Sequence, residues 1–477
     1  MTARRAVPFL LTAALAGCAI GPNYERPPVA SPESYRDEPA PAAPESLADL
    51  PFWEVFRDET LVALIREALA ENYDLRAIVA RVETARSTAA IARSELFPQV
   101  GYEAAAGRGK NSFLGAATPS GSEVGNSFLV ALNAFWEIDV WGRIRRASEA
   151  ARADLLATDA IRRAVLLSLV TTVAQAYFEL RTLDLELEIA QRSVVAFEKT
   201  RDLFDRQFKG GVASRLQVLR AEAALQQVAA TVPAIELQIV AKENQLSVLI
   251  GKPAGPITRG ATLVEQPPPP DVPPGIPAQL LERRPDLLEA EQTLVATNAR
   301  VGVAMADFLP RIGLTTLWGS VSPEVSDLLK NGTSLWSLLS SATGPILTFG
   351  QNWYGFEAAK SDWEAARASY EGQVLIALQD VSNALTARVK SAQIRDAQAL
   401  QVAALNESVR LATVRYVDGL SNYIEVLNAQ QQLFPAELEL ARAERDRLLA
   451  VVLLYSSLGG GWSYDGPAPT VPSPLRP

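Results

Sequence analysis

Arg143 to Lys209 reads RIRRASEAARADLLATDAIRRAVLLSLVTTVAQAYFELRTLDLELEIAQRSVVAFEKTRDLFDRQFK, a run of 67 residues without glycine or proline. Both of these residue types weaken or break helices, so their absence favours one continuous α-helix. At 1.5 Å per residue such a helix is on the order of 100 Å long, whereas an ordinary helix has about 11 residues. The stretch therefore predicts an unusual architecture that is built from very long helices.

The same stretch carries a sustained coiled-coil pattern. Alternating steps of three and four residues meet an apolar side chain at every position but one, Arg201. The positions are Leu166, Leu169, Val173, Ala176, Leu180, Leu183, Leu187, Ala190, Val194, Phe197, Arg201, Phe204 and Phe208. Such a seam predicts that the helix packs along its length against other helices, and its alanines favour close packing of several helices.

A second segment of the chain repeats the first. A shift of 208 residues superimposes identical residues, among them Gly142 on Gly350, Gly211 on Gly419 and Gly251 on Gly459. Upstream the offset becomes 212, and we expect a loop to absorb the difference. A constant register over so long a distance indicates an internal duplication. In the second copy the seam from Val374 to Tyr416 has a polar middle, so that helix either packs on a shifted face or exposes this stretch to water.

Proline clusters divide the chain, because proline is excluded from helix and central-strand interiors. We predict a signal peptide (1–17), an acylated N-terminus with an extended linker (18–57), a first repeat (58–252), a proline-rich linker (253–277), a second repeat (278–462) and a proline-rich tail (463–477). Each repeat is predicted to contain a first helix (about 58–95, then 278–306), a strand pair, the long helix, and a closing helix of roughly 35–40 residues.

Period-two alternation predicts the strands. Ser127 to Asp139 alternates cleanly, a weaker pattern surrounds Tyr102, and the second copy repeats the pair around Leu314 and Leu338. Alternation alone favours an ordinary half-buried antiparallel sheet in a soluble domain. Apolar-out, polar-in segments of about ten residues are also the signature of a transmembrane β-barrel. Four strands cannot close a barrel, so a membrane location requires oligomerisation, and three chains would supply twelve strands.

The N-terminus predicts a lipid anchor. Arg4 and Arg5 precede an apolar run that is too short to span a bilayer, and Leu15-Ala16-Gly17-Cys18 ends it. This ending resembles the bacterial lipobox, in which Cys18 becomes the acylated first residue, and Ala19 implies sorting to the outer membrane. The alternative is a buried apolar cysteine that happens to follow a signal sequence.

Composition excludes several kinds of chemistry. The 477 residues include no histidine and one cysteine, and the formal net charge is −9. Triads that use histidine, zinc sites with histidine ligands and internal disulfides are therefore excluded. The acidic balance argues against a nucleic-acid partner. No phosphate loop, metal cluster or catalytic pair of carboxylates is recognisable, so we expect no cofactor, no metal and no enzymatic activity.

Five stretches together resemble one known family. They are Cys18-Ala19-Ile20-Gly21-Pro22-Asn23-Tyr24, Trp141-Gly142-Arg143, Gly211-Val212-Ala213-Ser214, Arg415-Tyr416 with Gly419, and Leu458-Gly459-Gly460-Gly461-Trp462. Their order and spacing are similar to those of TolC-type outer membrane factors, in the NodT-like lipoprotein branch that serves resistance-nodulation-division efflux pumps.

The resemblance implies a fold and a function. The fold is an α+β membrane protein: a homotrimer with a twelve-stranded β-barrel in the outer membrane lipid and a coiled-coil periplasmic tunnel. It passively exports small molecules that an inner-membrane pump and a periplasmic adaptor hand over. A type I protein secretion channel is the alternative within transport. A non-transporting coiled-coil scaffold lipoprotein is another, but it leaves the strand pairs unexplained.

The resemblance also assigns candidate site residues at the periplasmic end of the tunnel. Arg415 and Tyr416 match residues that hold the closed state through acids on neighbouring helices, for which Asp202 and Asp205 are candidates. Ile424 and Asn428 match the constriction rings, although an aspartate is common at the position of Asn428. The adaptor-contacting turns contain Gly210, Gly211, Val212, Ser214, Gly419 and Ser421. On residue types alone these glycines are helix caps, and the Arg–carboxylate pairs are solvated ion pairs.

Overall fold

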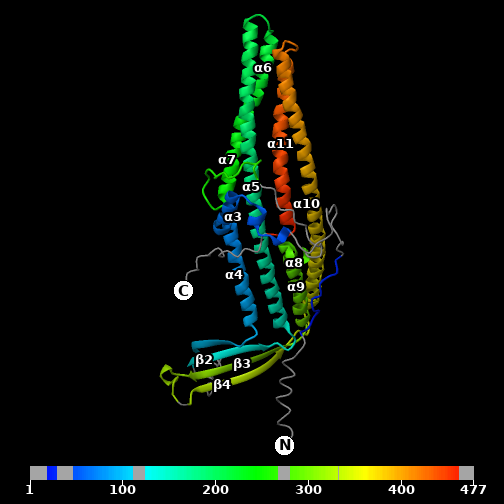
Figure 1. The fold of residues 1–477 in the computed structure, drawn as a ribbon. Coiled ribbons are helices and arrows are strands. Elements are labelled where there is room, and N and C mark those ends of the chain that lie inside the picture. The colour runs from blue at the N-terminus through cyan, green and yellow to red at the C-terminus, as the bar shows by residue number, and fades with distance from the viewer. Residues whose placement is uncertain (1–18, 30–46, 111–123, 267–279, 331, 461–477) are drawn as a thin grey trace. The chain divides into compact units, whose positions relative to one another are not determined.

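The computed structural model describes residues 19–29, 47–110, 124–266, 280–330 and 332–460, which form long helices and one β-sheet (Figure 1). Cys18, the signal peptide and the tail from 463 lie outside the described residues. The chain divides into two compact units. The first contains the N-terminal segment up to Pro28, residues 81–159 and residues 289–371, and the second contains the remainder.

The first unit holds a four-stranded antiparallel sheet. Its strands are β1 (Gln99–Lys110), β2 (Val124–Ile138), β3 (Arg311–Ser322) and β4 (Ser334–Thr343), in that spatial order. Tyr102 lies opposite Leu132, Leu132 opposite Trp318, and Trp318 opposite Trp336. The four predicted strands are therefore present and paired within the chain, with β1 and β4 at the edges.

One face of this sheet is apolar and exposed. The exposed apolar side chains that share it are Val100, Tyr102, Val130, Leu132, Trp318, Trp336 and Leu338. The alternate positions carry many polar side chains, which include Gln99, Glu103, Asn133, Thr315 and Ser337. Within the described part of the chain each of these side chains keeps at least half of its surface exposed, although Val325, Leu328 and Leu329 border the hollow at Tyr102 and Trp318.

Two acids at the end of β2 build the junction with the helix that follows. Arg143 donates two hydrogen bonds of 3.0 Å to the Glu137 carboxylate. The Asp139 carboxylate accepts from the backbone amides of Ile144 and Arg145, at 3.1 and 3.0 Å. An anion at a helix N-terminus satisfies amides that have no partner within the helix. Both acids therefore have structural roles here.

The helix α5 (Arg143–Lys209) confirms the prediction from the glycine- and proline-free run. The helix α10 (Gln351–Val417) also has 67 residues, although it contains Gly355 and Gly372. Most positions of the α5 seam are buried, namely Leu166, Leu169, Val173, Ala176, Leu180, Leu183, Ala190, Phe197 and Phe204. In α10 the seam is buried from Val374 to Ala384, but no residue from 386 to 411 is buried in this chain. The polar middle of the second seam, at Arg388, Ser391, Arg395 and Gln398, is therefore half-buried, and no residue on another face of this stretch is buried instead.

Three of the predicted helices are divided. The predicted helix at 58–95 is α3 (Glu59–Glu71) and α4 (Tyr73–Ser94), and that at 278–306 is α8 (Leu280–Arg283) and α9 (Pro285–Ala306). The first closing helix is α6 (Arg215–Ala229) and α7 (Thr231–Leu249), whereas the second, α11 (Ile424–Ser457), is continuous. A proline in the first turn of the following helix accounts for two of the breaks, Pro233 in α7 and Pro285 in α9, whereas α11 continues through Pro435. The minor helices are η2 (Leu47–Asp49), α2 (Phe52–Val55) and η4 (Val325–Asp327).

Equivalent contacts recur at the two helix breaks of the second unit. The Asn72 amide donates to the Leu249 carbonyl at the end of α7 (3.0 Å), and Arg284 donates to the Ser457 carbonyl at the end of α11 (2.9 Å). Gly251 and Gly459 follow these helix ends with φ of +73° and +77°. Both glycines pack closely against the backbone next to the helix break. A Cβ atom at Gly251 would lie 2.5 Å from the Glu71 carbonyl oxygen, and one at Gly459 would lie 3.1 Å from the Arg284 Cα atom. The two predicted repeats thus make the same junction.

Candidate functional site

The two predicted turns have the same backbone geometry. The amide of Val212 donates to the Gln207 carbonyl (2.9 Å), and the amide of Leu420 donates to the Arg415 carbonyl (2.8 Å). Each bond reaches back five residues around a glycine, Gly211 or Gly419, with φ of +76° or +70°. This is the Schellman motif, which requires a left-handed residue and so favours glycine.

The turns differ in how the next helix begins. Ser214 forms a capping box with Gln217, in which each side chain bonds the backbone amide of the other residue. The side chain of Val212 projects from this turn and is 80% exposed, and Gly210 beside it is exposed. In the second turn the Oγ atom of Ser421 is buried, yet it has no hydrogen-bond partner among the described residues.

The predicted gate residues Arg415 and Tyr416 have partners within their own chain. Arg415 is exposed, and its Nε lies 3.6 Å from the Glu425 carboxylate. The Tyr416 hydroxyl accepts a hydrogen bond of 2.6 Å from Gln207. Its ring meets that of Tyr423 edge to face, with the ring centroids 4.7 Å apart.

The predicted acids are engaged elsewhere in the chain. Asp202 pairs with Arg201 at 2.8 Å, and Asp205 pairs with Lys209 at 2.7 Å. The hydrogen bond from Lys209 holds the pKa of Asp205 below its usual value. Neither acid contacts Arg415 in the single chain, so a link between them stays a prediction about neighbouring subunits.

The two predicted constriction residues lie near the start of α11. Ile424, its first residue, is half-buried, and the Asn422 side chain accepts from its amide at 3.1 Å. Asn428 is exposed one turn later. Glu425, also exposed, is the residue that approaches Arg415. The only carboxylate in this first turn is therefore already next to a positive charge.

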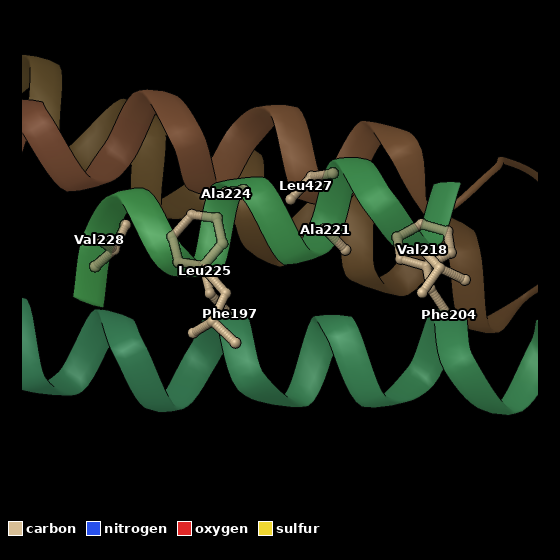
Figure 2. Close-up of a cluster of buried hydrophobic side chains, with 8 residues drawn as sticks. All are labelled: Phe197, Phe204, Val218, Ala221, Ala224, Leu225, Val228 and Leu427. Atoms are coloured by element: carbon tan, nitrogen blue, oxygen red, sulfur yellow. The ribbon is translucent and has the colours of Figure 1, made fainter. Parts of the chain in front are cut away.

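A buried apolar cluster fastens the start of α11 to the α5–α6 hairpin (Figure 2). Its members are Phe197, Phe204, Val218, Ala221, Ala224, Leu225, Val228 and Leu427. Only Leu427 comes from α11, and Tyr423, Ile424 and Phe434 of the same helix segment pack against the cluster. Buried apolar packing therefore holds the start of α11, which carries the candidate gate residues Ile424 and Asn428.

Sequence analysis missed Tyr423 and its polar neighbours Thr200 and Gln430. The Thr200 hydroxyl lies 3.1 Å from the Tyr423 hydroxyl and 3.0 Å from the Gln430 side-chain oxygen. A signal was present, because Tyr423, Leu427, Gln430 and Phe434 follow steps of four, three and four residues. That spacing is the coiled-coil pattern that identified the seam of α5.

Two searches of the described residues bear on other functions. No group of three or more acidic, cysteine or histidine side chains there has a geometry that could hold a metal ion. Within Arg215–Leu249 a window of 18 residues has a mean hydropathy of 1.2, so this stretch is long and apolar enough to cross a bilayer by length and composition. Since packed helices of water-soluble regions pass the same test, this is weak evidence for a membrane span.

Long helices, a sheet with an exposed apolar face and glycine-capped helical hairpins are features of outer membrane channel proteins. The sequence model described as "Outer membrane efflux protein" matches residues 64–252 and again residues 276–460. The chain belongs to this outer membrane efflux protein family.

Individual relatives are similar over nearly the whole chain. The cation efflux system protein CusC of Escherichia coli O6:H1 is 29% identical over 468 residues, which cover 97% of this chain and 100% of CusC. The toluene efflux pump outer membrane protein TtgI of Pseudomonas putida is 31% identical over 480 residues, with 96% and 98% covered. The solved open-state structure of the Neisseria gonorrhoeae MtrE outer membrane channel has a TM-score of 0.84 at 33% identity, with 93% and 99% covered.

Proposed function

We propose that three copies of this chain form the outer membrane duct of a tripartite efflux system. The twelve strands close a barrel in the outer membrane, and the long helices continue it as a periplasmic tunnel. Small molecules pass through without any bond being made or broken. They arrive from an inner-membrane pump of the resistance-nodulation-division type through a periplasmic adaptor.

The observation that carries this proposal is the sheet with one exposed apolar face and two open edges. Side chains such as Leu132 and Trp336 would be in contact with lipid, and the polar alternate positions would line the channel. Edge strands cannot stay open in hydrocarbon, because their unpaired amides and carbonyls would lack partners. Closure of β1 of one copy on β4 of the next satisfies both edges.

Two neighbouring residues on β4 give a direct test. Leu338 and Ser337 are both exposed and lie on opposite faces of the strand. We expect Leu338→Lys to prevent insertion, since a lysine at the bilayer midplane costs about 2–4 kcal/mol per chain, and Ser337→Lys to be tolerated. The measurements are the yield of SDS-resistant trimers and pore formation in planar bilayers. Equal tolerance of both lysines would refute the barrel.

The lipid anchor at Cys18 belongs to the same proposal. Acyl chains would hold the N-terminus at the outer membrane, and their role would be sorting rather than pore formation. Replacement of Cys18 by serine, behind a cleavable signal, should therefore leave trimers that form pores after purification. If that variant gave no trimeric pores at all, the separation of the two roles would be wrong.

The internal duplication and the domain boundaries are also part of the proposal. The repeats at 58–252 and 278–462 are supported by the two matches to the family and by the equivalent junctions at Asn72 and Arg284. Within this arrangement the Gly210–Ser214 turn and the turn at Gly419 and Ser421 face the adaptor. The exposed side chain of Val212 supports this for the first turn, since a partner chain can cover it.

The exported compound is chosen elsewhere in the assembly. CusC is a component for cations and TtgI one for toluene, yet both align with nearly all of this chain. A shared outer duct with different cargoes is consistent with selection by the pump. Reconstitution with a cognate pump and adaptor, followed by transport of a small dye or of an unfolded polypeptide, would separate efflux from type I secretion.

A further inference from the structure

One face of α11 docks on the α5–α6 hairpin. Tyr423 caps the N-terminus of α11, and Leu427 and Gln430 follow at four and seven residues. With 100° per residue these positions fall within about 60° of one another. Leu427 is buried in the apolar cluster, and Tyr423 packs against it. The face therefore has an apolar centre flanked by two polar side chains.

A buried hydroxyl on α5 connects those two polar side chains. Thr200 is fully buried, and its Oγ1 lies 3.1 Å from the Tyr423 hydroxyl and 3.0 Å from the Gln430 oxygen. It also lies 3.1 Å from the carbonyl of Ala196 in its own helix. A threonine hydroxyl donates only one hydrogen bond. Most partners are satisfied when Tyr423 donates to Thr200 and Thr200 donates to Gln430.

The ring of Tyr423 extends this contact to the third helix. It meets Phe204 of α5 edge to face at 5.4 Å and Tyr416 of α10 at 4.7 Å. Such pairs contribute beyond the area that they bury. Only Ala412 is buried between 386 and 417, and the end of α10 is otherwise held by the Gln207–Tyr416 hydrogen bond and the Arg415–Glu425 pair. Tyr423 thus adds a contact to both α5 and α10 at this end.

The docked face determines where the opposite face points. Asn428 follows Tyr423 by five residues, which is about 140° around the helix, and it is exposed. If α11 rotated about its own axis against the α5–α6 hairpin, Asn428 would turn by the same angle. We propose that Tyr423 and Thr200 are positioning residues of the gate, which fix the rotation of α11 and thereby the direction of the Asn428 amide. This inference rests on the proposed channel function.

The contact of Tyr423 with Thr200 differs from the neighbouring ion pair of Arg415 and Glu425 in charge and in burial. Its side chains, Tyr423, Thr200 and Gln430, are neutral, and Thr200 is fully shielded from solvent. Arg415 and Glu425 are both about half exposed, with 56% and 48% of the side chain accessible. Salt screens exposed charges and has little effect on a buried neutral hydrogen bond. The Tyr423 contact should therefore hold α11 equally at low and high ionic strength.

The test uses conservative variants of full-length trimers in planar bilayers. Thr200→Val and Tyr423→Phe each remove one hydroxyl and keep the packing. Thr171→Val is the matched control, because Thr171 is also a buried α5 residue but its hydroxyl bonds only to its own helix. The second readout is the rate at which a thiol reagent modifies Asn428→Cys in each background, measured against parents without that cysteine.

We expect each hydroxyl variant to change the occupancy of the open state and the Asn428→Cys labelling rate about fivefold, as one neutral hydrogen bond shifts an equilibrium. The double variant should change them no further than Thr200→Val alone, because Tyr423→Phe removes a contact that Thr200→Val has already broken. The effect should be equal at 0.1 and about 1 M KCl. Thr171→Val should behave as the wild type.

Three outcomes would overturn the inference. They are wild-type behaviour of both hydroxyl variants, additive effects in the double variant, and an equal effect of Thr171→Val. Absence of any pores from the wild-type trimer would instead refute the channel function. If Thr200→Val fails to assemble into SDS-resistant trimers, Tyr423→Phe with the labelling assay decides the question, because Tyr423 is only half-buried.

Discussion

The guanidinium of Arg26 binds both carboxylate oxygens of Glu291, with Nε and Nη2 each 2.7 Å from its partner. Tyr24 donates a third hydrogen bond of 3.0 Å to the same carboxylate, which is 6% exposed as a residue. Burial and the nearby negative charge of Glu291 hold the pKa of Tyr24 well above its usual value, so its hydroxyl remains a donor. The extended N-terminal segment is thereby fixed to α9.

Loss of this pair should destabilise the first unit. Arg26→Ala leaves a buried carboxylate without its cation, and because Arg26 is itself partly exposed we expect a loss of about 1–3 kcal/mol in the free energy of unfolding. The measurement is chemical denaturation followed by circular dichroism. Arg86→Ala, which breaks an exposed pair with Glu83, is the control and should cost about 0–1 kcal/mol. Equal losses would contradict the structural role of the N-terminal segment.

A buried arginine of the second unit, Arg284, predicts a pH dependence of stability. Arg284 donates to Asp286 at 2.7 Å, to Asp380 at 3.0 Å and to the Ser457 carbonyl. Burial alone would raise the pKa of Asp286, but the hydrogen bonds and charge of Arg284, with a further bond from Gln373, hold it below its usual value. A carboxyl with a depressed pKa stabilises the folded state above its unfolded pKa of about 3.9, and that stability is lost as pH falls through the folded value.

Asp286→Asn should therefore lower the melting temperature at pH ~7 and flatten its decline below pH ~4. Thermal unfolding of wild type and variant across that range is the measurement. The neutral amide keeps the shape of the side chain, so a difference between the two profiles reports on charge. Parallel profiles would show that Asp286 does not contribute through its ionisation.

The long helices could be predicted from the sequence because their signal is local. A run without glycine or proline from Arg143 to Lys209 leaves no place for a helix to end, and α5 has those bounds. The break at Asn72 was missed, since it depends on an amide that bonds a carbonyl 177 residues away. The partners of Arg415 and Tyr416 depend on how three helices pack, which residue types alone do not specify.

The pairing at the end of α10 predicts a change in conductance. Arg415→Ala combined with Tyr416→Ala removes the ion pair with Glu425 and both contacts that hold this end of α10. We expect a larger single-channel conductance in planar bilayers, because fewer links restrain the helices that converge at the gate. The part due to Arg415 should shrink as salt rises, since exposed pairs are screened. An unchanged conductance at low salt would contradict the assignment of these residues to the gate.

Asn428 predicts the ion selectivity of the constriction. It is exposed on the face of α11 opposite the docked one, so three copies would form a neutral ring of amides. Asn428→Asp replaces this ring with three carboxylates, which should attract cations and raise the potassium-to-chloride permeability ratio roughly twofold or more at low salt. The reversal potential in a salt gradient measures this ratio.

Asn406→Asp is the control, because it adds the same charge at an exposed site of α10 away from the turn, and it should leave the ratio near that of the wild type. If both variants shift the reversal potential equally, Asn428 does not line the narrowest part of the pore.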